Sequence, residues 1–121
     1  MKITVRITKN FKSEAKPLFK KYPSFTDDLY ELEKQLLQNP RLGDEIGKNA
    51  YKIRLKIKSK KRGKSGGARV ITFVESFIIA ELHNSVNETT VNLISVYDKG
   101  DTAAISDKEL QGLIQEFLSS K

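Results

Sequence analysis

The chain has 121 residues, of which 38% are hydrophobic and 31% are charged, and its formal net charge is +7. This length and composition predict one globular domain spanning residues 1–121, and they exclude multidomain enzymes and disordered or fibrous chains. Because the chain has no Cys and a single His, His83, disulfides, thiolate chemistry and clustered-histidine metal sites are also excluded, and we expect neither a metal nor a cofactor.

The N-terminal segment alternates the apolar residues Ile3, Val5 and Ile7 with polar ones, which predicts a half-buried strand over residues 2–8. Lys and Arg residues interrupt this segment, so it does not resemble a signal peptide. No part of the chain approaches the roughly 20 apolar residues that span a bilayer. We therefore expect a cytoplasmic protein without membrane contact.

Two helices are predicted next. Apolar residues recur at helical spacing over residues 11–21, but Pro17 predicts a short or kinked helix, or one that begins near Ser13. The second helix is capped by Ser24 or Thr26 and ends at Asn39-Pro40. Its apolar face consists of Leu29, Leu32 and Leu36. Residues 41–49, which contain two glycines, are expected to form a loop.

The most strongly charged segment runs from Lys48 to Arg69. It holds ten of the 22 basic residues and no acid, which leaves 12 basic and 15 acidic residues elsewhere. Residues 50–58 alternate apolar and cationic side chains, which predicts a strand with one face of each kind. The cations of that strand are Lys52, Arg54, Lys56 and Lys58. Like charges about 7 Å apart repel one another, so this pattern favours a phosphate-binding surface. A solvated lysine-rich loop is the structural alternative.

A glycine-rich basic loop over residues 59–67 follows, then a strand from Ala68 to about Leu82. We expect a hairpin turn near residues 86–88 and a returning strand over residues 91–97. The sequence Ser-Asp-Lys-Glu at 106–109 is a capping box, and the apolar residues after it predict a C-terminal helix. The fold class is therefore α+β, with an N-terminal strand, two helices, a three-stranded antiparallel meander and a closing helix. The helices are expected to cover one face of the sheet and leave the other to the cations.

Three residues near the strand ends are candidate site residues. Arg69 follows Gly66-Gly67, where a phosphate can approach the backbone and a guanidinium can hold two of its oxygens. A salt bridge from Arg69 to Glu75 or Asp101 is the structural alternative. Tyr97 and Lys99 end the last strand, and Tyr97 either caps the core or joins the site. Asp98 and Asp101 are expected to bring negative charge next to these residues.

Four motifs occur in order: an N-P-x-x-G-D turn, a K-I-R strand, a basic G-K-x-G-G-x-R loop and Y-x-K at the end of the last strand. Together with the helix opened by S-D-K-E-L, they resemble the RelE/HigB branch of the RelE/ParE toxin superfamily over about residues 22–118. The hairpin around residues 76–90 is longer than that of compact family members, which predicts a protruding ribbon.

The resemblance implies the toxin of a type II toxin–antitoxin system, an mRNA endonuclease that acts in the A site of the 30S ribosomal subunit and is neutralised by a cognate antitoxin. It marks as catalytic Lys52, Arg54, Arg69, Tyr97 and Lys99. The remaining cations are expected to bind RNA or the ribosome: Lys56, Lys58, Lys60, Lys61, Arg62 and Lys64.

Physical reasoning agrees with this selection. Cleavage of RNA by its own 2′-OH needs a proton acceptor, positive charge for the phosphorane and a proton donor for the leaving oxygen, and none of these requires a metal or His. Two alternatives stay open: a ParE-like gyrase inhibitor, and a non-enzymatic RNA- or ribosome-binding module. Fold alone does not decide among the three. The cationic strand with Arg69, Tyr97 and Lys99 favours RNA cleavage, because gyrase binding needs no phosphate-centred group of residues.

Overall fold

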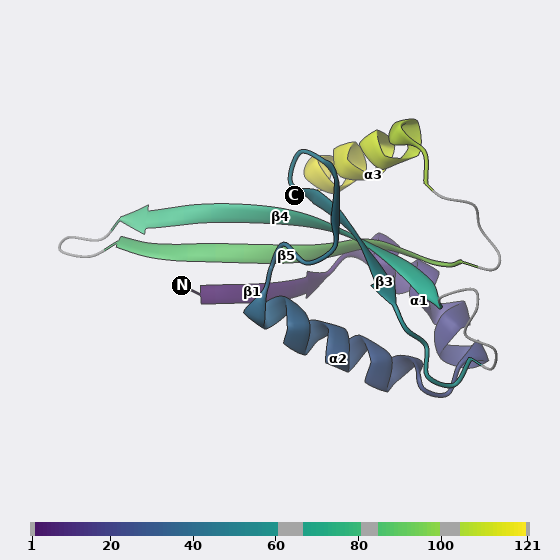
Figure 1. Ribbon diagram of the computed structural model, residues 1–121. Helices are drawn as coiled ribbons and strands as arrows, with labels where there is room; N and C mark the ends of the chain where they lie inside the picture. The colour runs from purple at the N-terminus through teal and green to yellow at the C-terminus, as the bar shows by residue number, and fades with distance from the viewer. Residues whose placement is uncertain (1, 61–66, 81–84, 100–104, 121) are drawn as a thin grey trace.

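The computed structural model describes residues 2–60, 67–80, 85–99 and 105–120 (Figure 1). These residues form three helices and one five-stranded mixed sheet, which confirms the α+β class. The elements are β1 (Lys2–Ile7), α1 (Lys9–Lys21), α2 (Phe25–Gln38), β2 (Asp44–Gly47), β3 (Ala50–Leu55), β4 (Ala68–Ala80), β5 (Ser85–Asp98) and α3 (Asp107–Ser119). None of the described helices is both long and apolar enough to cross a membrane.

The strands are arranged in the order β1-β5-β4-β3-β2, with β1 parallel to β5 and all other pairs antiparallel. The predicted meander is therefore present as β3, β4 and β5. The prediction of a loop over residues 41–49 is wrong, because residues 44–47 form β2 at the sheet edge. This strand has four residues and an irregular register between Glu45 and Gly47, so it carries no clear alternation in the sequence.

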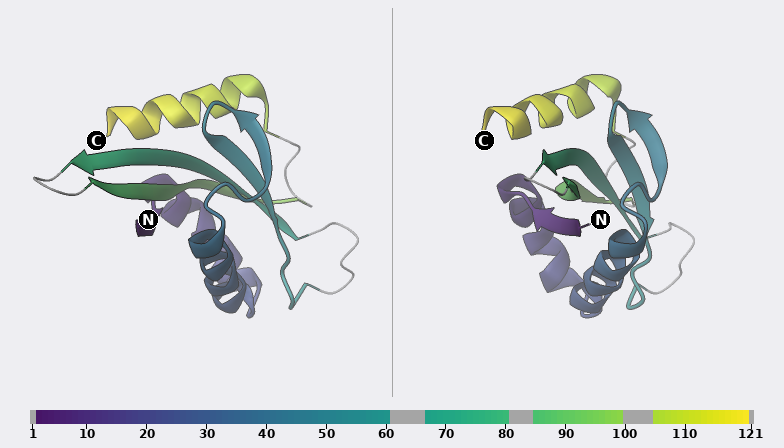
Figure 2. Two further views of the ribbon diagram at one scale, coloured as in Figure 1. Left: turned by 60° about the vertical axis from the view of Figure 1, so that its left-hand side comes forward. Right: turned by 90° about the vertical axis from the view of Figure 1, so that its left-hand side faces the viewer.

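Both faces of the sheet are covered by helices (Figure 2). The side chains of α1 and α2 pack on one face in a core that includes Phe11, Phe25 and Leu36. A second, smaller core under α3 joins Leu110 to Ile71 and Ile94. The expectation that helices cover one face and leave the other to the cations is therefore wrong. The apolar residues of α3 need a surface to bury against, and the centre of the second face provides it.

Helix α1 begins earlier than Pro17 suggested. Thr8 caps the helix by accepting a hydrogen bond from the Phe11 N–H at 3.2 Å, and Pro17 lies inside the helix. The first turns also close the edge of β5 beyond β1: the Asn10 amide donates to the Ile94 carbonyl at 2.8 Å, and Glu14 accepts from the Val96 N–H at 3.3 Å. These contacts and the buried face of α1 offset the hydrogen bond that Pro17 cannot make.

The strands of the meander differ in length from the prediction. Strand β3 ends at Leu55, not at Lys58, while β4 and β5 pair as far as Ala80 opposite Ser85. The turn expected at residues 86–88 is wrong, since these residues lie in β5 and face residues 77–79 of β4. The outcome is the predicted protruding ribbon, which extends beyond the neighbouring strands (Figure 1).

The C-terminal helix matches its prediction. Ser106 accepts from the Glu109 N–H at 3.1 Å, the Ser106 N–H donates to the Glu109 carboxylate at 3.3 Å, and the capping box is complete. Leu110 is buried, and the apolar residues one and two turns later pack on the second core. A local capping signal followed by helical periodicity was sufficient to define this element.

Candidate nucleic-acid interface

Register brings three of the five predicted catalytic residues into one row across the sheet. Arg54 of β3 lies directly opposite Arg69 of β4, and Arg69 lies directly opposite Tyr97 of β5. Residues directly opposite in antiparallel strands share a face, with Cβ atoms about 5 Å apart. Positions far apart in the sequence thus become neighbours.

The other two predicted catalytic residues lie two residues away along the strands, in the next rows on the same face of the sheet. Lys52 pairs with Ile71, two residues along β3 from Arg54. On the other side, the Lys99 N–H donates to the Gly67 carbonyl at 3.1 Å, which places Lys99 beside Gly67. We call the surface formed by Lys52, Arg54, Lys56, Lys58, Arg69 and Lys99 the cationic end of the sheet.

Gly67 brings β3 and β4 close together at this end. Its φ is +70°, and a Cβ there would lie 2.3 Å from the Leu55 carbonyl oxygen and 2.9 Å from the Ile57 nitrogen. Gly67 therefore lies against the backbone on either side of Lys56, between this lysine and Lys99. Only a residue without a side chain allows this approach. The two cations consequently flank a position where the sheet surface carries no side chain.

Exposure separates the cations into two groups. Arg54, Lys56, Lys58 and Lys99 are exposed, and Lys52 is partly buried. Arg69 is only 8% exposed, and its guanidinium donates to the Ala68 carbonyl at 3.2 Å. A polyanion approaching this end would therefore meet the exposed cations before Arg69.

The structural alternatives for Arg69 involve acidic residues. Glu75 lies six residues along the same strand, about 20 Å away, which is beyond the reach of an Arg side chain. A salt bridge between Arg69 and Glu75 is therefore excluded. Asp101 lies outside the described residues.

Tyr97 belongs to the small core. Its ring packs with the cluster under α3. Its hydroxyl is buried, with no hydrogen-bond partner among the described residues. This arrangement favours the core-capping interpretation, because a hydroxyl shielded from solvent does not reach a bound RNA without rearrangement. The buried, unpaired hydroxyl carries a desolvation cost of about 1–3 kcal/mol.

Asp98 does not lie beside Arg69 and Tyr97, as the sequence suggested, but points to the opposite face. Its carboxylate accepts a hydrogen bond from the Tyr22 hydroxyl at 2.6 Å and pairs with Lys60 at 2.9 Å and Lys21 at 3.6 Å. The Lys60 side chain is 14% exposed. The charge of Lys60 is thus neutralised by Asp98 inside the protein, so Lys60 is poorly placed to bind phosphate. Three further predicted RNA-binding residues lie outside the described residues: Lys61, Arg62 and Lys64.

A polar cluster that sequence reasoning missed fixes the chain after β3 to the start of α2. The Lys58 N–H donates to the Asp28 carboxylate at 3.2 Å, and Ser24 donates to the same carboxylate at 2.7 Å. The Ser59 N–H donates to the Ser24 hydroxyl at 2.8 Å. Asp28 is only 2% exposed. Asp28 lies in the first turn of α2, where acidic residues are common because they favour the helix dipole, so the sequence carries no local signal for its role in this cluster.

Besides a hollow that Tyr97 lines together with residues of α3, two hollows lie near these elements. The first, about 450 Å³, separates α2 from the open edge of β3, with Arg54, Lys56 and Lys58 on one wall and Asp28 and Glu31 on the other. It is open because β2 covers only the first half of β3. Three residues of the cationic end therefore also border a hollow next to α2: Arg54, Lys56 and Lys58.

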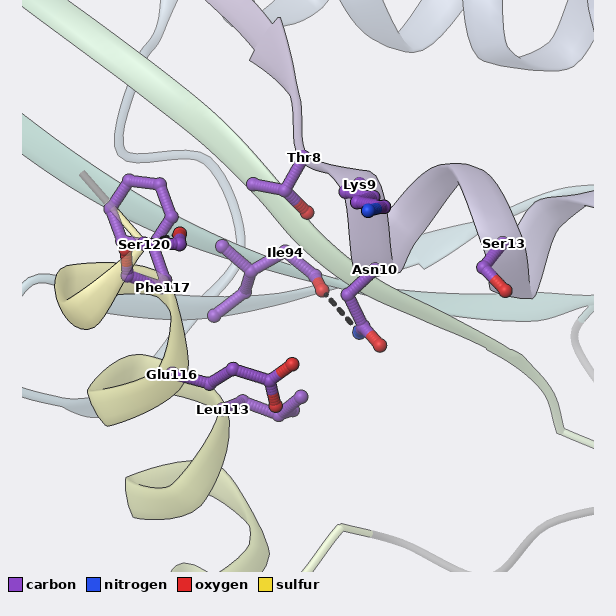
Figure 3. Close-up of a pocket in the computed structure, with 9 residues that line it drawn as sticks. All are labelled: Thr8, Lys9, Asn10, Ser13, Ile94, Leu113, Glu116, Phe117 and Ser120. Carbon is purple, nitrogen blue, oxygen red and sulfur yellow. Dashed lines mark hydrogen bonds between the residues drawn. The ribbon is translucent and has the colours of Figure 1, made fainter.

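The second hollow, about 350 Å³, lies between the start of α1 and α3, over β5 (Figure 3). Its lining includes Ile94, Leu113 and Phe117, and the Asn10 amide crosses it to the Ile94 carbonyl. None of the predicted site residues lines it. It is therefore separate from the candidate interface.

Comparison with known proteins adds no relative. No protein-family model matches the chain, and no curated protein matches it. The functional interpretation consequently depends on the sequence motifs and on the geometry of the cationic end.

Proposed function

We propose that this protein is the toxin of a type II toxin–antitoxin system and that it cleaves mRNA on the ribosome. One observation carries the proposal: the residues that the RelE/HigB resemblance marks, spread over positions 52 to 99, lie in adjacent rows at one end of one sheet. Exposed cations surround the row, as phosphate binding requires.

The proposed reaction is an internal displacement at phosphorus. The RNA 2′-oxygen attacks the adjacent phosphate and loses its proton to a basic group, while the P–O5′ bond breaks and the 5′ oxygen gains a proton. The products are a 2′,3′-cyclic phosphate and a 5′-hydroxyl. Positive charge fixed next to the phosphorane stabilises the transition state more than the ground state.

Exposure suggests which residues meet the phosphate first. Arg54 is exposed and has a planar guanidinium that can hold two phosphate oxygens. Arg69 lies directly opposite and is buried, so its contribution is a positive charge beneath the surface. Lys52 and Lys99 lie one row away on either side and are candidates for proton transfer. Tyr97 then acts as a positioning residue, since its hydroxyl is buried.

The test is single-turnover cleavage of mRNA on programmed ribosomes, with cut sites mapped by primer extension. We expect Arg54→Ala to cleave on the order of a hundredfold more slowly at saturating ribosome, because one phosphate contact in the transition state is lost. Arg6→Ala removes the same charge from an exposed position on β1 and should cleave at the normal rate. Equal rates for the two variants would contradict the assignment of Arg54.

A toxin should also arrest growth when it is produced alone. We expect growth to recover when the product of the neighbouring gene is produced with it, because a bound antitoxin covers the cationic end. The antitoxin segment should be anionic or amphipathic. Unchanged growth at high levels of folded protein would count against any toxin, including a gyrase inhibitor of the ParE type.

The burial of Arg69 and of the Tyr97 hydroxyl favours a second candidate, an RNA- or ribosome-binding module without catalysis. Lys58→Ala separates the two. If the cationic end only binds, losing this exposed cation should weaken RNA binding and reduce the salt slope by about one unit, with no cleavage by any variant. If the protein cleaves, Lys58→Ala should lower affinity but leave the rate at saturation unchanged.

A further inference from the structure

Past its pairing with β3, the outer edge of β4 has no partner strand among the described residues. The last backbone bond on that edge is from the Val74 N–H to the Asn49 carbonyl, at 2.8 Å. Beyond Val74, no other described strand pairs with the outer side of β4, although β4 continues to Ala80. Figure 1 shows the ribbon extending past the rest of the sheet.

Alternation along a strand identifies the backbone groups that face outward on this edge. The Val74 N–H points toward β3, so the N–H and C=O groups of Ser76, Ile78 and Ala80 point the same way. The groups of Phe77 and Ile79 point toward β5. The edge therefore presents a row of backbone donors and acceptors at the spacing that an added strand needs.

Exposed apolar side chains lie on both faces of the ribbon. Phe77 is 48% exposed and Ile78 is 76% exposed, and neighbouring residues of a strand point to opposite faces. A partner lying on one face would cover only one of them. A strand added at the edge would place a neighbour next to both, which favours an edge-pairing partner over a face-packing one.

The exposed edge of β4 also lacks most of the features that prevent edge strands from pairing with other chains. Residues 75–80 contain no Lys or Pro, and their one charged residue is Glu75 at the start of the segment, whereas proteins usually protect exposed edges with charged residues, Lys above all, and with Pro. The last four of these residues are apolar and include the β-formers Phe77, Ile78 and Ile79, a composition that favours association when a strand edge is exposed. We propose that a second copy of this chain covers it, by antiparallel pairing of the two β4 edges into one continuous sheet.

Charge and register favour a second copy as the occupant. Antiparallel pairing centred on Phe77 places Glu75 opposite Ile79 and Ser76 opposite Ile78 of the other copy, so no two carboxylates face each other. Ser76 and Ile78 then exchange four backbone hydrogen bonds between the copies. The cationic end lies at the other end of β4, and at physiological salt the Debye length is about 8 Å. The basic segments of the two copies therefore do not oppose this contact.

The absence of Cys makes the register testable, because a single introduced Cys can form a disulfide only with the same Cys of a second copy of the chain. Directly opposite residues have Cα atoms about 4.5–5.5 Å apart, within the range of a disulfide. We expect Phe77→Cys to form a reducible dimer under mild oxidation. Ser76→Cys should form at least tenfold less, since its symmetry mate lies about 8 Å away. If Ile78→Cys gave the highest disulfide yield instead, the same two edges would pair, with the twofold axis at residue 78 and not at residue 77.

Sedimentation velocity of the unmodified chain is the second measurement. We expect association at concentrations on the order of 100 µM, typical of a small interface. Ile78→Lys should weaken association at least tenfold, while Leu37→Lys, which places the same charge on a 45% exposed position of α2, should not. Monomer at every concentration, or equal disulfide yields from Phe77→Cys, Ser76→Cys and a distant Ser13→Cys, would overturn the proposal. Neither result bears on mRNA cleavage.

Discussion

At the end of β4 that begins with Ala68, the charged residues Arg69 and Asp98 are buried, and Asp98 holds Tyr22 and Lys60 in contact with β5. At the end near Ala80, no described strand flanks β4 or β5 beyond the pair of Phe77 and Glu88, and Phe77 and Ile78 are exposed. The β4–β5 strand pair thus has buried polar residues at one end and exposed apolar residues at the other. Because folded proteins open first where few groups are buried, stability should vary along this pair.

The largest effect is expected where the fold encloses charge. Asp98→Ala removes the acceptor for the Tyr22 hydroxyl and the counter-ion of Lys60, both in a nearly buried cluster. Breaking one partner of a buried ion pair costs about 3–5 kcal/mol, because the other partner is left uncompensated. Urea unfolding followed by circular dichroism should show this loss.

A surface substitution supplies the control for Asp98. Glu33→Ala removes one negative charge from an exposed position of α2 and should change the free energy of unfolding by no more than about 0.5 kcal/mol. Asp98→Asn keeps an acceptor for Tyr22 and should lie between the two. If Asp98→Ala were no more destabilising than Glu33→Ala, the carboxylate would not hold this end together.

The same truncation at two positions of β4 compares the two ends directly. Ile71 is fully buried under α3, whereas Ile78 is 76% exposed in the ribbon. We expect Ile71→Ala to cost about 3 kcal/mol through lost burial and a cavity. At concentrations where the protein is monomeric, Ile78→Ala should cost no more than about 0.5 kcal/mol. If urea unfolding showed similar losses of stability for the two variants, Ile78 would be buried against the rest of the protein in solution.

Substitutions of two glycines by Ala should change the free energy of unfolding by smaller amounts, and in opposite directions at the two positions. Gly67→Ala places a Cβ against the Leu55 carbonyl at a φ of +70°, so β3 and β4 must separate, and we expect a loss of about 2 kcal/mol. Gly112→Ala has no atom within 4 Å in α3 and should stabilise by about 0.5–1 kcal/mol. Thermal melts of both variants test this pair. A neutral Gly67→Ala would remove the close strand approach from the candidate site.

The elements that could be predicted from the sequence are those with local signals. Helix α3 has its capping box, and β3 has strict alternation. Three features depend on distant partners and were missed: the four-residue β2, the packing of α3 on the second face, and the pairing of residues 86–88 with β4. Asn87 resembled a turn signal because its strand partner, Ile78, is visible only in the folded protein.

The candidate site shows the same division. The identities of Arg54, Arg69 and Tyr97 could be selected from motifs, and the structure places them in one row. Their burial could not be predicted, because it depends on how far α3 and its neighbours cover the sheet. Asp98 appeared to lie beside Tyr97 because the two are adjacent in the chain, but adjacent residues of a strand point to opposite faces.

Tyr97 gives the smallest and most discriminating effect. Its hydroxyl is buried without a partner among the described residues, so Tyr97→Phe removes a polar group whose desolvation is not compensated. The variant should be more stable by about 0.5–1 kcal/mol, since the ring and its packing against the small core are kept. Cleavage of mRNA should stay within about twofold of the normal rate, because the ring still positions the end of β5. Urea unfolding and single-turnover cleavage of the same preparation measure both quantities. A more stable variant that cleaves tenfold or more slowly would place this hydroxyl in the reaction and require the small core to open when RNA binds.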